Sequence, residues 1–227
     1  MKKIPYWAMA AVFILSLVAG IVNAIGFLGV KTEAVSHLTG TSTLLGTVLF
    51  NDGLMSLHIF IVILLFVIGS ALSSFLISLP PWQTGKIYSL LLLAEALLFT
   101  ISSVLLGKGG MTGVHLASLA CGIQNGMTTI FSAGPGRTTH VTGTFTDIGI
   151  MAGSALKGES IERRKMTMLV SLAVGFISGG VVGYYLFEKI SFSSLLVPAV
   201  ICLILGITCY IHLRKKENGQ AFVHQGS

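Results

Sequence analysis

The chain carries the segment HLTGTSTLLG at residues 37–46 and a near copy of it, HVTGTFTDIG, at residues 140–149. Both copies fit the pattern H-x-T-G-T-x-T-x-x-G. A second pair of short segments precedes them, GIVNA at residues 20–24 and GIQNG at residues 122–126. Repetition of this kind is typical of a duplicated structural unit. The sequence therefore predicts two related halves that follow one another along the chain.

The composition is that of a membrane protein. Of the 227 residues, 53% are hydrophobic and 10% are charged, whereas a soluble domain has about 25% charged residues. Six apolar runs approach or exceed the roughly 20 residues that a bilayer crossing requires. These runs are residues 4–30, 54–79, 87–107, 111–133, 166–187 and 192–213. The first run resembles a cleaved signal peptide, but its GIVNA segment has an internal counterpart, so we expect it to remain as a span.

The order of these runs predicts an all-α, polytopic transmembrane helical bundle with inverted halves. Residues 4–107 and 111–213 each hold three long spans and one shorter segment, at residues 38–51 and 138–156. As a helix the first short segment measures about 21 Å, less than the roughly 30 Å hydrocarbon core, so we expect two short re-entrant or broken helices. Three crossings per half place the halves in opposite orientations, as in many transporters. The alternative is eight crossings and parallel halves.

Charge predicts the orientation of this single membrane domain, residues 1–213. The formal net charge is +6, and basic residues gather near the N-terminus, at residues 157–165 and at residues 214–216. Short loops rich in lysine and arginine stay in the cytoplasm. We therefore expect both termini in the cytoplasm, residues 214–227 as a disordered polar tail, and no nucleic-acid partner. The bilayer is the expected partner, because basic membrane edges attract anionic lipid.

Polar residues inside the predicted spans define a candidate site, because such residues are costly in a membrane and mark functional positions. The candidates are Asn23, His37, Thr39, Thr41, Gln124, Asn125, Arg137, His140, Thr142, Thr144 and Asp147. A helix N-terminus beside an arginine favours anions, so we expect these residues to bind a small polar or anionic solute between the repeats. The structural alternative is a packing motif of small residues and threonines. The run at residues 111–133 is notably polar, so we expect it at the centre of the bundle.

The repeated segments also predict local structure. Thr39 and Thr142 suit helix starts, where a hydroxyl caps free backbone N–H groups. In the second copy His140, Thr144 and Asp147 fall on one helix face. The glycines of both copies are expected to let another backbone approach closely. These glycines are Gly40, Gly46, Gly143 and Gly149.

Glu95 is the carboxylate that lies in the middle of a long apolar run. Such an acid is either protonated or paired across helices, so Glu95 is a candidate for proton coupling, with a structural buried acid as the alternative. The chain lacks the sequence patterns of common nucleophilic, zinc-dependent and nucleotide-binding enzymes. Its three cysteines lack zinc-ligand spacing. We therefore expect no catalytic residues, no metal and no cofactor.

Four segments resemble the YoaK-like family of bacterial multi-pass membrane proteins. They are GIVNAIGFL at residues 20–28, VSHLTGT at residues 35–41, GIQNG at residues 122–126 and RTTHVTGTFTDIG at residues 137–149. The resemblance implies a bacterial inner-membrane protein, and because the family is a domain of unknown function it implies no substrate. Members usually carry Asp-Ala where this chain has Asn23 and Ala24, which weakens a proton-relay role at that position.

Two functions fit the sequence. The first is a small secondary transporter or channel that binds its solute at the interface between the repeats, and it predicts a polar cavity near the middle of the membrane. The alternative is a non-transporting membrane module, such as an assembly partner, sensor or lipid-binding protein, and it predicts a bundle packed without a cavity. Homo-oligomers are compatible with both functions.

Overall fold

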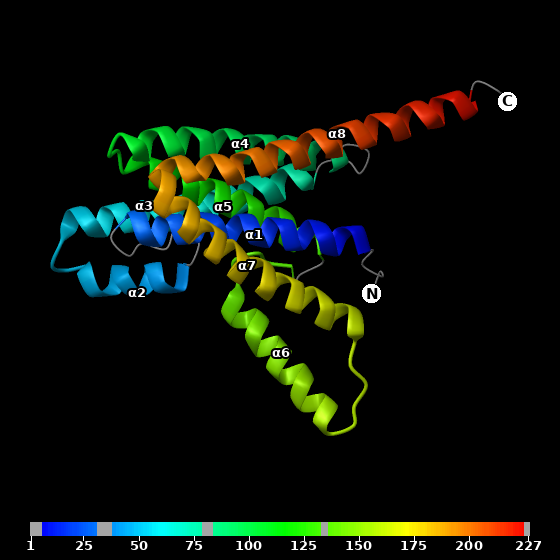
Figure 1. Ribbon diagram of the computed structural model, residues 1–227, viewed down its shortest axis with the longest axis horizontal. Helices are drawn as coiled ribbons and strands as arrows, with labels where there is room; N and C mark the ends of the chain where they lie inside the picture. The colour runs from blue at the N-terminus through cyan, green and yellow to red at the C-terminus, as the bar shows by residue number, and fades with distance from the viewer. Residues whose placement is uncertain (1–5, 31–37, 79–83, 133–135, 225–227) are drawn as a thin grey trace.

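The computed structural model describes residues 6–30, 38–78, 84–132 and 136–224, and its regular secondary structure in these ranges is helical (Figure 1). Only the backbone is described at residues 6–8, 84 and 213–224. The helices in these ranges are α1 (Tyr6–Gly29), α2 (Leu38–Val48), α3 (Gly53–Ile77), α4 (Thr84–Gly107), α5 (Thr112–Phe131), α6 (Val141–Leu156), α7 (Arg163–Ile190), the short 3-10 helix η2 (Ser191–Leu195) and α8 (Leu196–His224).

Helical segments long and apolar enough to cross a membrane indicate a membrane protein. Among the described residues they are Met9–Gly29, Gly53–Ile77, Gly85–Gly107 and Arg163–His212. The last segment contains α7, η2 and much of α8, which fold back on each other as a hairpin (Figure 1). Large apolar side chains such as Phe60 and Phe75 of α3 are exposed, as expected for a surface that faces lipid. The described parts of all six predicted long runs lie in helices, but α5, in the fourth run, is not among these membrane-length segments.

α2 and α6 are the short helices that the sequence predicts in each half. They contain 11 and 16 residues, fewer than the roughly 20 that a crossing requires. Figure 1 shows that both begin near the middle of the long axis and run toward opposite ends of the bundle. α2 packs on α3, and α6 packs on α7.

The long helices associate in pairs, and glycines allow the closest contacts between α1 and α7. A methyl group added to Gly20 would overlap the carbonyl oxygen of Phe176, and one added to Gly179 would overlap the carbonyl oxygen of Leu17. Small residues at such positions let helix backbones approach each other in membranes. The two backbones are therefore in direct contact along this pair.

The pair formed by α3 and α5 has the same contacts. A methyl group added to Gly122 would overlap the carbonyl oxygen of Phe66, and one added to Gly69 would overlap the carbonyl oxygen of Leu119. In both pairs, each of these glycines contacts a carbonyl group of the partner helix. That carbonyl belongs to the residue three positions before the partner helix's own contact glycine. The third pair, α4 with α8, closes the bundle.

α5 lies at the centre of the bundle, as its polar sequence predicts. It contacts α1, α3 and α4, and more than half of its 20 residues are buried. Its buried side chains include polar ones, among them Ser118, Gln124 and Thr128. A polar helix placed here makes its hydrogen bonds inside the protein rather than facing lipid.

Two local predictions are wrong. Residues 214–224, expected as a disordered tail, continue α8 as a helix. Three of the four glycines of the repeated segments do not receive a neighbouring backbone: the space beside Gly46 and Gly149 is open within 4 Å, and Gly143 lies under the ring of His140. Close backbone contact is provided instead by the glycines of the long helices, because those helices pack along their length.

Candidate solute-binding cavity

A cavity of about 430 Å³ lies between α3, α5 and the N-terminal ends of α2 and α6. This volume is within the range of about 300–1,000 Å³ that small-molecule sites occupy. Its described lining residues are Leu38, Thr39, Phe66, Ser70, Ser74, Asn125, Gly126, Thr129, Ile130, Arg137, Thr139, His140, Val141 and Thr142. Both repeated segments therefore contribute to one wall of a single space.

The candidate residues from the sequence divide into two groups. Thr39, Asn125, Arg137, His140 and Thr142 line the cavity. A second group is placed elsewhere: Asn23, Thr41, Gln124, Thr144 and Asp147 are not among its lining residues. His37 lies outside the described residues. The lining group comes from four different elements, which only the folded chain brings together.

A buried polar network holds the segment that leads into α6. The Thr138 side chain is 1% exposed; its hydroxyl accepts a hydrogen bond from Gln124 Nε2 at 3.0 Å and donates one to Asn125 Oδ1 at 3.1 Å. Asn125 also bonds the side chain of Thr139 and accepts from the Thr139 backbone N–H at 3.3 Å. Ser16 of α1 reaches the Thr138 carbonyl oxygen at 3.4 Å. Because an unpaired buried polar group is costly, this network fixes the approach to His140.

Gln124 supports this network rather than the cavity wall. Its Nε2 atom also donates to the carbonyl oxygen of Leu15 at 2.8 Å, which ties α5 to α1. Its Oε1 atom is buried and has no hydrogen-bond partner among the described residues. The sequence did not single out Thr138 and Thr139, although both stand immediately before His140 in the repeated region.

The start of α6 differs from its prediction. The N-cap residue is His140, which makes no side-chain capping bond, and Thr142 is already the second helical residue. Thr39 is likewise the second residue of α2, so neither threonine is the N-cap. The ring of His140 lies over Gly143, where a methyl group would overlap it. The first backbone N–H groups of a helix lack intrahelical acceptors, and the first two residues of α6 line the cavity.

The cavity wall has a positive character. Arg137 is exposed and, among the described lining residues, is the one with a permanent charge. It forms no ion pair with the part of the chain that the structure describes. Asp147 instead approaches Lys165 of α7, with 3.9 Å between Oδ2 and Nζ. That pair is too exposed to contribute much stability.

Glu95 of α4 is buried against α8. Its side chain is 0% exposed, and its Oε2 atom accepts a hydrogen bond from Cys202 Sγ of α8 at 3.6 Å. Its Oε1 atom has no hydrogen-bond partner within the described ranges. An ionised carboxylate would be very costly in such an environment, so the neutral acid fits these contacts. Glu95 is not among the described residues that line the cavity.

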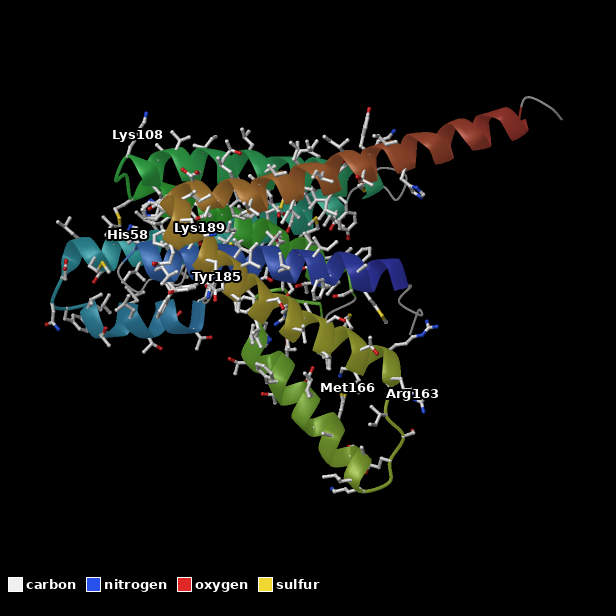
Figure 2. The ribbon with its side chains drawn as sticks, in the orientation of Figure 1. His58, Lys108, Arg163, Met166, Tyr185 and Lys189 are labelled. Atoms are coloured by element: carbon white, nitrogen blue, oxygen red, sulfur yellow. The ribbon has the colours of Figure 1, made fainter. Side chains whose placement is uncertain are left out.

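A histidine pair that the sequence did not predict joins α3 to α5. His115 Nε2 and His58 Nδ1 are 2.9 Å apart, and the partly buried rings are in contact. Figure 2 shows His58 and Lys108 at one end of the bundle and Arg163 at the other. Within the described ranges, no group of three His, Cys, Asp or Glu side chains is arranged to hold a metal.

Comparisons with known proteins give the family of the chain. No curated protein matches it, and no solved structure matches it. The family model described as "Protein of unknown function (DUF1275)" matches residues 11–208. This family is the YoaK-like family, so the resemblance in the repeated segments is confirmed. The chain belongs to this family of proteins of unknown function.

Proposed function

We propose that the chain is a small secondary transporter or channel, which moves a small polar or anionic solute across the bacterial inner membrane. One observation carries the proposal: Thr39 from the first repeated segment lines the same cavity as His140 and Thr142 from the second. In transporters built from inverted repeats, the substrate site lies at the repeat interface near the middle of the bilayer. The function needs no catalytic residue, metal or cofactor.

The helix contacts support an inverted repeat. If α1 to α4 correspond to α5 to α8, then the pair of α1 with α7 corresponds to the pair of α5 with α3. The glycine contacts of these two pairs match as that correspondence requires. α4 with α8 maps onto itself, and α2 on α3 maps onto α6 on α7. Duplicated halves related by a pseudo-two-fold axis account for all these pairings.

Two buried serines provide an independent match. Ser16 Oγ of α1 donates to the carbonyl oxygen of Leu172 at 2.8 Å. Ser118 Oγ of α5 donates to the carbonyl oxygen of Val62, also at 2.8 Å. Each serine stands four positions before the glycine that contacts the partner helix. A serine at equivalent positions of α1 and α5 therefore bonds a carbonyl oxygen at equivalent positions of their partner helices, α7 and α3.

The direction of the helices supports six crossings with both termini in the cytoplasm. The start of α1 and the end of α8 lie at the same end of the bundle as the turn between α6 and α7 (Figure 1). The sequence concentrates basic residues near these three places. The α3 and α5 residues of the cavity wall come from the later parts of those helices, which end near this face. With this topology the cavity would open toward the cytoplasm, and movement of one half against the other would open the opposite side.

The alternative of a non-transporting module is less well supported. It predicts a bundle packed without a polar space where the repeated segments lie. The structure instead has a cavity of about 430 Å³ with serine, threonine, asparagine and arginine in its wall. Solute movement therefore remains the better proposal.

A solute-exchange screen in proteoliposomes tests the proposal. The full chain is reconstituted, and uptake of labelled amino acids, organic acids, sugars and inorganic anions is measured against empty vesicles. We expect at least one solute to exchange, and we expect His140→Ala to reduce that exchange about tenfold or more, by analogy with the loss of a substrate hydrogen bond.

His212→Ala is the matched control, because His212 is an exposed histidine near the end of the described side chains of α8. It should exchange solute at the wild-type rate. Failure of the wild-type protein to move any solute would count against transport, and so would equal exchange by the His140→Ala and wild-type proteins.

A further inference from the structure

We infer that the cavity binds a small organic anion, with its carboxylate beside Arg137 and an apolar body against α3 and α5. This inference rests on the proposed transport function and narrows its solute. It follows from the uneven distribution of charge, hydrogen-bond donors and apolar groups around the wall.

Charge selects an anion. Arg137 is exposed to the cavity, and its guanidinium has no ion-pair partner among the described residues. None of the described lining residues is an aspartate or glutamate. The planar guanidinium matches a carboxylate with two parallel hydrogen bonds. A cation would meet repulsion here without any described counter-charge.

Free hydrogen-bond donors line the same cavity as Arg137. The hydroxyls of Thr39 and Thr142 make no hydrogen bond with any described residue. His140 and the first backbone N–H groups of α6 lie beside them. Together with Arg137, these groups form a set of donors that a carboxylate can satisfy and that a neutral apolar group would leave unpaired.

In the part of the wall formed by α3 and α5, the hydroxyl of Ser74 makes no hydrogen bond with a described residue, but the other two hydroxyls are occupied. Ser70 already donates its hydroxyl to the carbonyl oxygen of Gly122 at 3.0 Å, and Thr129 donates its hydroxyl to that of Asn125 at 2.6 Å. Phe66 of α3 and Ile130 of α5 add apolar surface to this part of the wall. An inorganic anion such as phosphate would not be stabilised by this apolar surface. A short hydrocarbon chain would gain binding free energy by burial against it.

Three probes of similar size test whether the cavity prefers an anion, a neutral molecule or a cation. They are butyrate, butyramide and butylammonium. Binding to the purified full chain in detergent is measured by isothermal titration, because butyric acid crosses bilayers unaided. We expect butyrate to bind about tenfold or more tightly than butyramide, as a charge-assisted hydrogen bond implies. Butylammonium and inorganic phosphate should bind more weakly still.

Substitution of the arginine then locates the carboxylate. Arg137→Gln should abolish the preference for butyrate over butyramide, and Arg137→Lys should retain part of it because the charge remains. Lys157→Gln removes a cation from the far end of α6 and should change nothing. The melting temperature of each unliganded variant confirms that it folds.

Equal affinity for butyrate and butyramide would overturn the inference, as would a butyrate preference that survives in Arg137→Gln. Neither result would disprove transport, because the exchange screen can still find another solute. If butyrate binds as expected but no solute is exchanged, the anion site stands and the transport function fails.

Discussion

Thr138 shows how one polar side chain can organise a site that it does not enter. Its hydroxyl bonds Gln124 and Asn125, and its carbonyl oxygen lies 3.4 Å from the Ser16 hydroxyl, whose shorter bond at 2.8 Å goes to Leu172. These partners come from α1 and α5, so a single residue ties the α6 approach to two long helices. The neighbouring Arg137 and Thr139 line the cavity, and their positions depend on this anchoring.

Thr138→Val removes the hydroxyl while keeping the shape of the side chain. We expect the free energy of unfolding to fall by roughly 1 kcal/mol, because Gln124 and Asn125 each lose a buried partner and membrane hydrogen bonds have about this strength. Reversible unfolding in mixed micelles measures it. Thr146→Val is the control, since the Thr146 hydroxyl bonds only the Thr142 carbonyl oxygen of its own exposed helix, and an equal loss there would contradict this assignment.

Gly143→Ala should change solute exchange without lowering folding stability, because it displaces the ring of His140. The ring of His140 occupies the space that the new methyl group needs, and a ring at the end of a side chain can move aside. We expect stability to stay level or rise by up to about 1 kcal/mol, since alanine favours the helix, while solute exchange falls. Gly149→Ala adds the same methyl group in open space. Exchange that falls equally in both variants would show that His140 is not the cause.

At the scale of helices, the glycines of α7 provide a direct test of how the long pairs pack. Gly179→Ala would push a methyl group into the carbonyl oxygen of Leu17, whereas the space beside Gly180 is open within 4 Å. We expect Gly179→Ala to lower the free energy of unfolding by about 1–3 kcal/mol, as overpacking does, and Gly180→Ala to leave it nearly unchanged. Unfolding in mixed micelles compares the two neighbours.

The inverted repeat extends that test to the other pair of helices. Gly69 of α3 occupies the place that Gly179 occupies in α7, and a methyl group there would overlap the carbonyl oxygen of Leu119. Gly69→Ala should therefore cost the same within about 1 kcal/mol, given the scatter of such effects at matched sites. A negligible effect at Gly69 would argue against equivalent helix pairs.

At the scale of the whole molecule, six and eight crossings differ in the side on which the turn between α2 and α3 lies. With six crossings Asn51 faces outward, and with eight it faces the cytoplasm. Figure 1 shows this turn at the opposite end from the turn between α6 and α7. A cysteine at Asn51, in a chain whose three native cysteines are replaced, should react with a membrane-impermeant maleimide added to intact cells.

Gly158→Cys is the matched comparison for that labelling. It lies beyond the end of α6, on the basic turn that both arrangements place in the cytoplasm. It should react only after the cells are opened. Labelling of both positions from the same side would exclude the arrangement with six crossings and, with it, the inverted repeat.

The sequence by itself determined the elements of this protein. Apolar length identified the six long helices, because a bilayer imposes that length on any crossing segment. The repeated segments identified α2 and α6 and the central, polar α5. They also supplied Thr39, Asn125, Arg137, His140 and Thr142, which line the cavity.

Only the tertiary structure decided which of the polar residues face the same space. Asp147 and Arg137 belong to the same repeated region, but only Arg137 lines the cavity, whereas Asp147 lies two turns along α6 and approaches Lys165 of α7. Ser70 and Phe66 belong to an apolar run that gave no sign of a site, and they line the cavity because α3 packs on α5. The physical reason is that local periodicity fixes the direction of a side chain within its own helix, whereas the facing surface comes from contacts between distant segments.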